Sequence, residues 1–262
     1  MKNFITENAP VIFFAGERHS FLRFVKRGEK FSSHFGEVCY DDVIGLKYGA
    51  SVKTHNGRVF YLLKPSLAEL EKGVKRATTI MYPKDIGYMV LMGSIKPGSY
   101  VAEVGAGSGA LTSVLASLVG ETGKVFSFDR RKEFLNLCKK NMEKLGLEKR
   151  VVFFERDVSI EGFGDIEVDT LIVDVPAPWD IVKPGIDIIH GGGVWISLSP
   201  QIEQIVKTHR ALSMSGFVRI EVVEMFLRKM KIRTVGTRPE ERMVSHTGYI
   251  LTANRIAIDN VR

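Results

Sequence analysis

The run from Val101 to Leu111, read Val-Ala-Glu-Val-Gly-Ala-Gly-Ser-Gly-Ala-Leu, constrains the fold of this chain more than any other stretch. Its apolar start is typical of a buried strand, and Gly105, Gly107 and Gly109 predict a sharp turn that leads into a helix. Without Cβ atoms, the turn can approach a ligand closely and leave helix N-terminal amides facing it. The sequence therefore predicts a loop that binds a nucleotide-containing cofactor.

Two cofactors fit this loop. The pattern Gly105-x-Gly107-x-x-Ala110 satisfies the dinucleotide fingerprint, and Asp129 follows at about the spacing expected for a ribose-binding acid. Read from Glu103 onward as Glu-x-Gly-x-Gly-x-Gly, the same loop resembles motif I of the methyltransferases that use S-adenosylmethionine. The glycine pattern alone fits both cofactors, so the cofactor has to be identified from the rest of the chain.

The first part of the chain is predicted to be a separate small domain, because 262 residues suffice for one domain of ordinary size and a small one. Residues 1–77 are β-rich, and Asn56-Gly57 is a strong hairpin signal. Apolar residues at helical spacing predict a connector helix over 65–76, and the boundary is placed near residue 78. The strands expected before it are 11–14, 21–25 and 52–63.

Residues 78–262 alternate between strand-like and helix-like periodicity, which is typical of an α/β doubly wound domain. The clearest helical stretches are 111–119, 132–145 and 201–214. The last two strand-like runs predict an antiparallel terminal hairpin, which suits a Rossmann-like methyltransferase sheet better than a classical dehydrogenase. The expected strands are 100–104, 124–129, 151–154, 170–174, 193–198, 217–226 and 247–253.

Composition narrows the class of protein and of partner. A net charge of +7 favours a polyanionic partner such as nucleic acid, although solvated surface charge explains it equally well. No apolar run approaches the roughly 20 residues that span a bilayer, and no secretion signal is visible, so no membrane contact and a cytoplasmic location are expected. Two cysteines and six scattered histidines predict neither a metal site nor a disulfide framework.

Two aspartates are expected on the adenosine side of a cofactor, at the edge where open α/β sheets bind ligands. Asp129 ends the second predicted strand and could accept both ribose hydroxyls, while the alternative for it is a helix N-cap. Asp157 follows the third strand and could accept the adenine amino group beside the Val158 amide. A turn aspartate explains Asp157 equally well.

A third aspartate directly follows the fourth predicted strand. Asp174 opens the segment Asp-Val-Pro-Ala-Pro-Trp, whose prolines stiffen the loop. The segment resembles, with wider spacing, the Asp/Asn-Pro-Pro-aromatic motif of methyltransferases that modify base nitrogens. There a carboxylate accepts hydrogen bonds from an adenine amino group and stabilises charge as a ring nitrogen is methylated. The alternative is a strand-end aspartate beside a core tryptophan, Trp179.

Tyr82 precedes a proline and an apolar helix, about 20 residues ahead of the glycine loop. Held by Pro83, its ring could stack on a base that has been flipped out of its helix. Alternatively, Pro83 is an ordinary first helical residue and Tyr82 packs against the helix.

Basic residues are concentrated in two segments, one between the last two predicted strands and one around Tyr82. Both segments could contact phosphates around the opening of the catalytic site. Solvated surface charge is the commoner explanation for any single residue. The residues assigned to phosphate contacts are Lys84, Arg228, Lys231, Arg233 and Arg238.

Six blocks of sequence, taken in order, resemble the archaeal and bacterial tRNA (adenine-N1)-methyltransferases that act at position 58, the archaeal members also at position 57. The resemblance covers nearly the whole chain. Each block is modestly specific, whereas the ordered set is highly specific. The blocks are 51–57, 63–67, 82–85, 103–111, 174–179 and 243–249.

The resemblance implies S-adenosylmethionine as cofactor and a T-loop adenine of tRNA as substrate. It implies that Tyr82 lies against the target base and that Asp174 holds its amino group. It also implies a homotetramer whose amino-terminal domain helps to hold tRNA. The residues implied for cofactor binding are Glu103, Gly105, Gly107, Ser108, Gly109, Ala110, Leu111, Asp129, Phe134, Asp157 and Val158.

The chain departs from the family pattern in two places. Asp129 stands where a glutamate is common and is one methylene shorter, so the ribose contact is expected to shift or to run through water. Cysteines that some archaeal relatives use for disulfides between subunits have no counterpart. The rival hypotheses are an NAD-dependent dehydrogenase, a methyltransferase of proteins or small molecules such as an isoaspartate methyltransferase, and a tRNA-binding module without activity.

Overall fold

The computed structural model describes residues 3–17, 19–74 and 81–257. By its contacts the chain divides into two compact units, Met1–Gly73 and Val74–Arg262. The boundary expected near residue 78 falls within 75–80, outside the described residues, as does the end of the predicted connector helix.

The first unit is β-rich, as predicted, and its hydrophobic core is aromatic. Phe13, Phe31 and Phe60 are fully buried, with ring centroids 4.9 to 6.2 Å apart. The connector is a short helix, α1 (Leu67–Lys72), which starts at a capping box between Ser66 and Glu69. All sheet pairs here are antiparallel: β2 (Ser20–Phe24), β1 (Pro10–Phe14), β6 (Val59–Leu63) and β5 (Ser51–Lys53) in that order, and β3 (Lys30–Ser33) with β4 (Gly36–Cys39).

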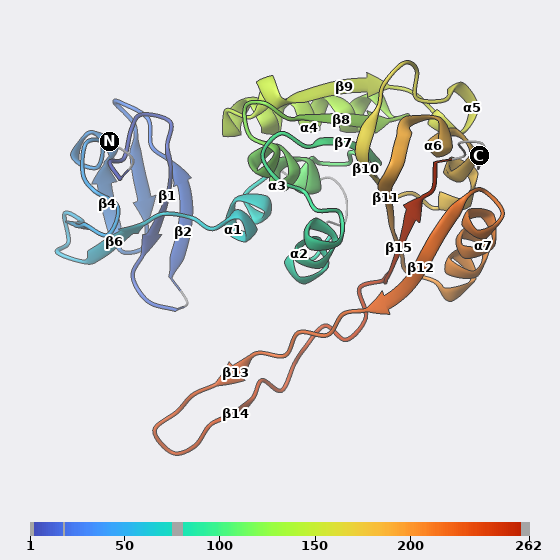
Figure 1. Cartoon of the computed structure of the whole chain (residues 1–262). Coiled ribbons are helices and arrows are strands. Elements are labelled where there is room, and N and C mark those ends of the chain that lie inside the picture. Colours follow the sequence, from blue (N-terminus) through green and yellow to red (C-terminus); the bar gives the residue numbers. More distant parts are fainter. Residues whose placement is uncertain (1–2, 18, 75–80, 258–262) are drawn as a thin grey trace. The chain divides into compact units, whose positions relative to one another are not determined.

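The second unit is built on one seven-stranded sheet (Figure 1). Five strands are parallel, and the last two in the chain enter antiparallel to their neighbours, so the predicted doubly wound sheet with an antiparallel terminal hairpin is confirmed. The spatial order is β12 (Phe217–Glu224), β15 (Tyr249–Arg255), β11 (Ile189–Ser199), β10 (Val168–Val173), β7 (Tyr100–Val104), β8 (Lys124–Asp129) and β9 (Val151–Glu155).

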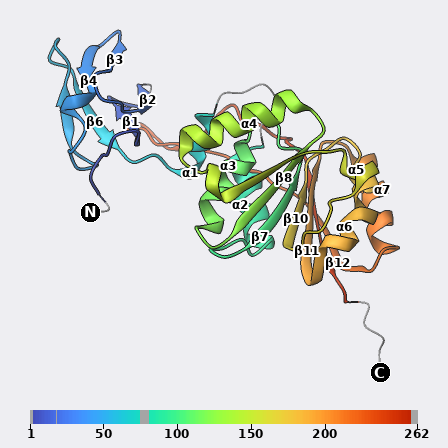
Figure 2. The same cartoon turned by 90° about the horizontal axis from the view of Figure 1, so that it is seen from above.

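Helices cover both faces of this sheet (Figure 2). On one face lie α2 (Pro83–Met92), α3 (Ala110–Val119) and α4 (Lys132–Leu145), and on the other α5 (Val158–Glu161), α6 (Val182–Ile188) and α7 (Ile202–Ser213). Three short 3-10 turns complete the described elements: η1 (Tyr40–Asp42), η2 (Glu148–Arg150) and η3 (Pro178–Ile181).

Alternation along the strands divides the core into two layers. Val101, Ile172 and Ile196 pack with the helices of the first face, whereas their chain neighbours Ala102 and Leu171 pack with those of the second. Successive side chains of a strand point to opposite faces, and helices cover both faces of this sheet. Strands such as β10 are therefore apolar at nearly every position.

The strand order reverses between β7 and β10. From β7 the chain moves outward through β8 and β9, and it then returns to place β10 on the other side of β7. Open α/β sheets bind their ligands outside the carboxyl ends of the strands at such a point. The glycine loop follows β7 and Asp174 follows β10, so both lie at this switch point.

A long arm leaves the sheet between β12 and β15. Figure 1 shows it as an extended hairpin, paired where β13 (Met230–Lys231) meets β14 (Arg238–Pro239). The sequence predicted only a loop here. We call residues 225–248 the arm. Its exposed apolar side chains are Phe226, Leu227, Met230, Ile232, Val235, Met243 and Val244.

Candidate active site

The glycine loop needs glycine at two positions. Gly105 has a φ of +99°, and a Cβ there would lie 2.3 Å from the backbone oxygen of Asp174. Gly109 has a φ of +81° and forms the N-cap of α3, and a Cβ there would lie 2.6 Å from the Sγ atom of Cys138. Both side chains would meet atoms that hold the loop in place. The predicted sharp turn from strand to helix is therefore confirmed.

Two cavities flank this loop. One, of about 290 Å³, is lined by the ends of β8 and β10 together with Asp157, Val158 and Ser159. The other, of about 240 Å³, is lined by Glu103 and the glycine loop. Three residues line both cavities, namely Gly105, Arg131 and Asp174. Most of the predicted cofactor residues thus line one of these two cavities, Gly109 and Phe134 being the exceptions, and Asp174 lines both.

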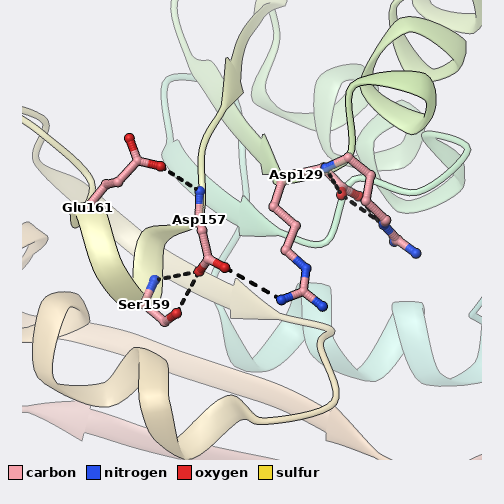
Figure 3. Close-up of polar contacts among 6 residues, drawn as sticks. Asp129, Asp157, Ser159 and Glu161 are labelled. Atoms are coloured by element: carbon pink, nitrogen blue, oxygen red, sulfur yellow. Dashed lines mark hydrogen bonds and ion pairs between the residues drawn. The ribbon is translucent and has the colours of Figure 1, made fainter.

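Asp129 braces the glycine loop from the first cavity. Its Oδ2 atom accepts a hydrogen bond from the Gly107 amide at 3.1 Å, and its Oδ1 atom accepts one from the Arg131 amide at 3.0 Å. The Arg131 Nε atom adds an ion pair at 3.2 Å (Figure 3). Only 3% of the Asp129 side chain is exposed. The side chain lies where the ribose contact was predicted, and it also fixes the shape of the loop.

Asp157 caps α5. Its Oδ1 atom accepts hydrogen bonds from the amide and the hydroxyl of Ser159, and Arg130 lies 3.5 Å from its Oδ2 atom (Figure 3). The Asp157 amide in turn donates to Glu161. The Ser159 hydroxyl is the main reason that the pKa of Asp157 is lowered. Asp157 therefore acts as the N-cap of α5. Asp157 and Val158 both line the first cavity, and their contact with adenine stays a prediction.

Glu103 is the most perturbed carboxyl group of the second cavity. It is 1% exposed, and its Oε2 atom accepts hydrogen bonds from the hydroxyls of Thr112 at 2.6 Å and Ser127 at 2.9 Å. Its Oε1 atom is buried without a partner among the described residues. Burial raises the pKa of Glu103 to about 8, and the charges of Asp174 and Asp129 add to the shift. A cationic ligand group beside Glu103 would favour the ionised carboxylate and so find an acceptor in its Oε1 atom.

The remaining residues of the second cavity come from the loop and the first turn of α3. They include the predicted Gly107, Ser108, Ala110 and Leu111, and also Met81, which the sequence analysis did not single out. The backbone of Ser108 is held by Asn141, whose side-chain amide donates to the Ser108 carbonyl at 2.8 Å.

Asp174 lies at the meeting point of the two cavities. Its amide donates to the Val104 carbonyl at 2.9 Å, which continues the pairing of β10 with β7 for one residue. Asp174 is exposed to the solvent that fills the two open cavities, yet the protein atoms packed around them partly desolvate its carboxylate and raise its pKa to about 6. Trp179 lines neither cavity; instead, the Lys207 ammonium lies 4.6 Å from its ring centroid.

Tyr82 is the N-cap residue of α2, with Pro83 at the first helical position. Tyr82 is 41% exposed, so its ring is only partly covered, and its contact with a base stays a prediction. Its chain neighbour Met81 lines the second cavity. The structure thus places an exposed aromatic ring one residue from the cavity, although within 81–257 no hydrogen bond or ring contact joins Tyr82 to Asp174.

Phe134 lies outside both cavities. Its ring packs under the Arg131 guanidinium, 3.9 Å from the ring centroid. Arg131 itself lines both cavities and pairs with Asp129. Arg131 is not among the site residues predicted from the sequence, although its position two residues after a strand-end aspartate could have indicated it.

Lys84 differs from its predicted role. Its ammonium forms an ion pair with Asp85 at 2.7 Å, and only 8% of its side chain is exposed. A lysine that grips a phosphate must present its ammonium to solvent, so this placement disfavours the phosphate contact predicted for Lys84.

The other four predicted phosphate contacts lie on the arm and line neither cavity. Arg228, Arg233 and Arg238 are exposed, and Lys231 is half-buried. Arg228 donates to the Glu240 carbonyl at 3.4 Å, and Arg238 pairs with Glu241 at 2.6 Å. The arm is therefore a basic hairpin with some of its charge offset by its own glutamates.

The described part of the chain contains neither a metal-binding cluster nor a membrane-spanning helix. Among these residues no three His, Cys, Asp or Glu side chains are grouped so that they could hold a metal ion. None of the helices in the same residues has the length and apolar character needed to cross a membrane.

Known proteins resemble this chain over nearly its full length. A methyltransferase from Methanocaldococcus jannaschii, named tRNA (adenine(57)-N(1)/adenine(58)-N(1))-methyltransferase, is 34% identical over 253 residues, 87% of this chain and 89% of its own. The crystal structure of the Aquifex aeolicus tRNA (m1A58) methyltransferase matches with a TM-score of 0.80 and 31% identity, covering 97% of this chain and all of that one.

A second crystal structure is at least as similar. A protein from Thermotoga maritima, described as an S-adenosylmethionine-dependent O-methyltransferase, matches with a TM-score of 0.88 and 34% identity, covering 99% of this chain and 97% of that one. The family model described as the tRNA methyltransferase complex GCD14 subunit matches residues 59–247. The glycine loop, both cavities and most of the arm lie within this match, and the chain belongs to this tRNA methyltransferase family.

Proposed function

We propose that this protein transfers a methyl group from S-adenosylmethionine to N1 of adenine in the T-loop of tRNA, either at position 58 alone or at positions 57 and 58. The observation that carries the proposal is the position of Asp174, between two cavities that share the glycine loop. Family membership and the named relatives support the substrate class.

The residues present suit S-adenosylmethionine. Asp129, Asp157 and Val158 would hold its adenosine part in the first cavity. The second cavity would take the methionine part. There the unpartnered Oε1 atom of Glu103 would accept a hydrogen bond from a positively charged group of the cofactor. The bound cofactor supplies an electrophilic methyl group on a sulfonium. Because Asp174 lines both cavities, a base held by its carboxylate would lie close to that methyl group.

Asp174 would orient the base. Its carboxylate would accept a hydrogen bond from the adenine amino group, which leaves the N1 lone pair free to attack. A negative charge at that place also stabilises the positive charge that develops on the ring during transfer. Adenine N1 carries no proton at neutral pH, so no general base is needed, and alignment supplies much of the rate. Tyr82 would stack on the flipped base and offset part of the cost of unstacking.

The arm would bind tRNA and other protein chains. Arg228, Lys231, Arg233 and Arg238 would contact phosphates, whereas Lys84 is engaged with Asp85 and is left out of this set. Seven exposed apolar side chains on the same arm favour burial against further subunits. We therefore retain the homotetramer as the proposed assembly; the family name, which describes a subunit of a complex, makes a heteromer the alternative.

Labelled S-adenosylmethionine and unmodified tRNA provide the test. After incubation, nucleoside analysis should yield 1-methyladenosine, and a tRNA with guanosine at positions 57 and 58 should accept no label. A ribose 2′-O-methylated product would instead favour the O-methyltransferase description of the Thermotoga maritima structure. Tight NAD binding without S-adenosylmethionine binding would favour the dehydrogenase hypothesis.

Variants then test the assigned residues. Asp174→Ala should lose nearly all turnover while it keeps cofactor binding by calorimetry, with the exposed Asp165→Ala as a matched control. Near-normal turnover by Asp174→Ala would refute its role. Tyr82→Ala should weaken methylation and Tyr82→Phe should keep most of it, because stacking needs the ring and not the hydroxyl. Equal loss in both would argue against stacking.

A further inference from the structure

Three side chains from distant parts of the sequence form a closed network. The Lys84 ammonium donates to the Oδ1 atom of Asp85 at 2.7 Å and to the Thr247 hydroxyl at 2.6 Å. The Thr247 hydroxyl donates to the Oδ2 atom of Asp85 at 2.8 Å. Lys84 and Asp85 lie in the first turn of α2, and Thr247 lies where the arm returns to the sheet, 162 residues after Asp85.

The network depends on a hydroxyl at position 247. Asp85 is fully buried, and each of its carboxylate oxygens has one of these partners. The Thr247 hydroxyl acts as donor to Asp85 and as acceptor from Lys84, so it uses both of its functions. Removing it would leave a buried carboxylate oxygen without its donor, which the interior of a protein tolerates poorly.

One end of the network holds the segment that faces the cavity. Met81 lines the second cavity, and Tyr82 is the exposed ring beside it. The amides of Asp85 and Ile86 both donate to the Tyr82 carbonyl, at 2.9 and 3.1 Å. The Asp85 side chain and the Tyr82 backbone therefore belong to one rigid turn.

The other end holds the base of the arm. His246 contacts a carboxylate oxygen of Glu224 at 2.7 Å and the Pro200 carbonyl at 2.8 Å. Gly248 passes so close to β11 that a Cβ there would lie 2.9 Å from a methyl carbon of Leu198. Thr247 lies between these two anchored residues, so its position follows that of the arm base.

We propose that Thr247, Lys84 and Asp85 are positioning residues. They hold Met81 and Tyr82 beside the second cavity and keep both at a fixed place relative to the base of the arm. The inference rests on the proposed function, because it assigns the network to alignment of the target base. An RNA held by the arm would then meet Tyr82 at a fixed place. The network supplies this alignment without touching the cofactor or the base.

Isosteric replacement of Thr247 tests the proposal. Thr247→Val keeps the shape and removes the hydroxyl, and Thr247→Ser keeps the hydroxyl. We expect kcat for tRNA methylation to fall about 10- to 100-fold in the valine variant, since misplacement of about 1 Å has effects of this size. The KM for tRNA and the Kd for S-adenosylmethionine should change less than about threefold. The serine variant should recover most of kcat. Thr122→Val is the control, because Thr122 lies in an exposed turn at the opposite edge of the sheet, and it should match the wild type.

Hydrogen exchange gives a readout that does not need methylation. The amides of Asp85 and Ile86, which donate to the Tyr82 carbonyl, should exchange faster in Thr247→Val than in the wild type or in Thr247→Ser, with the sheet unchanged. Unchanged exchange in this segment would overturn the proposal. If the wild type forms no 1-methyladenosine, the proposed function fails, whereas the exchange result still reports on the network.

A double-mutant cycle asks whether the network acts through Tyr82. If it does, Thr247→Val should lower kcat no further in a Tyr82→Ala background, because the ring that it positions is absent. Full additivity of the two effects would overturn the proposal and leave Thr247 with a role in folding alone.

Discussion

Replacing Glu103 by glutamine should change how the stability of this protein depends on pH. Burial raises the pKa of Glu103 from 4.5 to about 8 in the folded chain. Above pH 4.5 the unfolded chain loses this proton while the folded chain keeps it, so stability falls as the pH rises towards 8. Integration over the two pKa values gives a loss of roughly 2 to 3 kcal/mol between pH 6 and pH 8.5 from this group alone.

Glutamine keeps the shape of Glu103 and cannot ionise. Urea unfolding of the wild type and of Glu103→Gln, measured at intervals from pH 6 to pH 8.5, should therefore give curves that diverge by about that amount, with the variant more stable at high pH. Glu121→Gln, an exposed change, serves as control because it should follow the wild type. Parallel curves for wild type and Glu103→Gln would refute the argument that Glu103 is protonated in the folded protein.

Three further outcomes are expected. Single-turnover methylation should slow as the pH falls below about 6, because the raised pKa of Asp174 lets the carboxylate lose its charge there; a flat rate from pH 5 to pH 7 would contradict this. Gly105→Ala should lose S-adenosylmethionine binding by calorimetry and about 1 to 3 kcal/mol of stability from strain, whereas Gly87→Ala, which meets no atom within 4 Å, should retain both. Arg233→Ala should raise the KM for tRNA and lower the slope of log KM against log salt by about one; an unchanged slope would remove Arg233 from the phosphate contacts.

The fold could be predicted closely because its signals are local. Strands buried on both faces read as short apolar runs, and β7 and β8 have the bounds that the sequence predicted. The glycine loop was equally local, since Gly105 and Gly109 have positive φ values that only a turn requires. The short β3–β4 hairpin carried no comparable signal and was missed.

The site was predicted in position but not in its contacts. Asp129, Asp157 and Asp174 lie at strand ends, as expected, because the carboxyl ends of parallel strands share one edge. Which partner each carboxylate takes depends on tertiary approach, and no spacing in the sequence encodes it. Lys84 shows this most clearly: its ammonium meets Thr247, 163 residues away, so its removal from the surface could not be foreseen.

The pairing of β7 with β10 sets the distance between the glycine loop and Asp174. The glycine loop and Asp174 leave neighbouring strands at the same level, joined by the bond from the Asp174 amide to the Val104 carbonyl. Neighbouring strands lie about 4.8 Å apart, whatever the length of the loops that follow them. Under the proposed function, the gap between methyl donor and acceptor base would therefore be set by the backbone of the sheet. Insertions in the surrounding loops could alter which RNA is admitted while the distance that the methyl group travels stays the same.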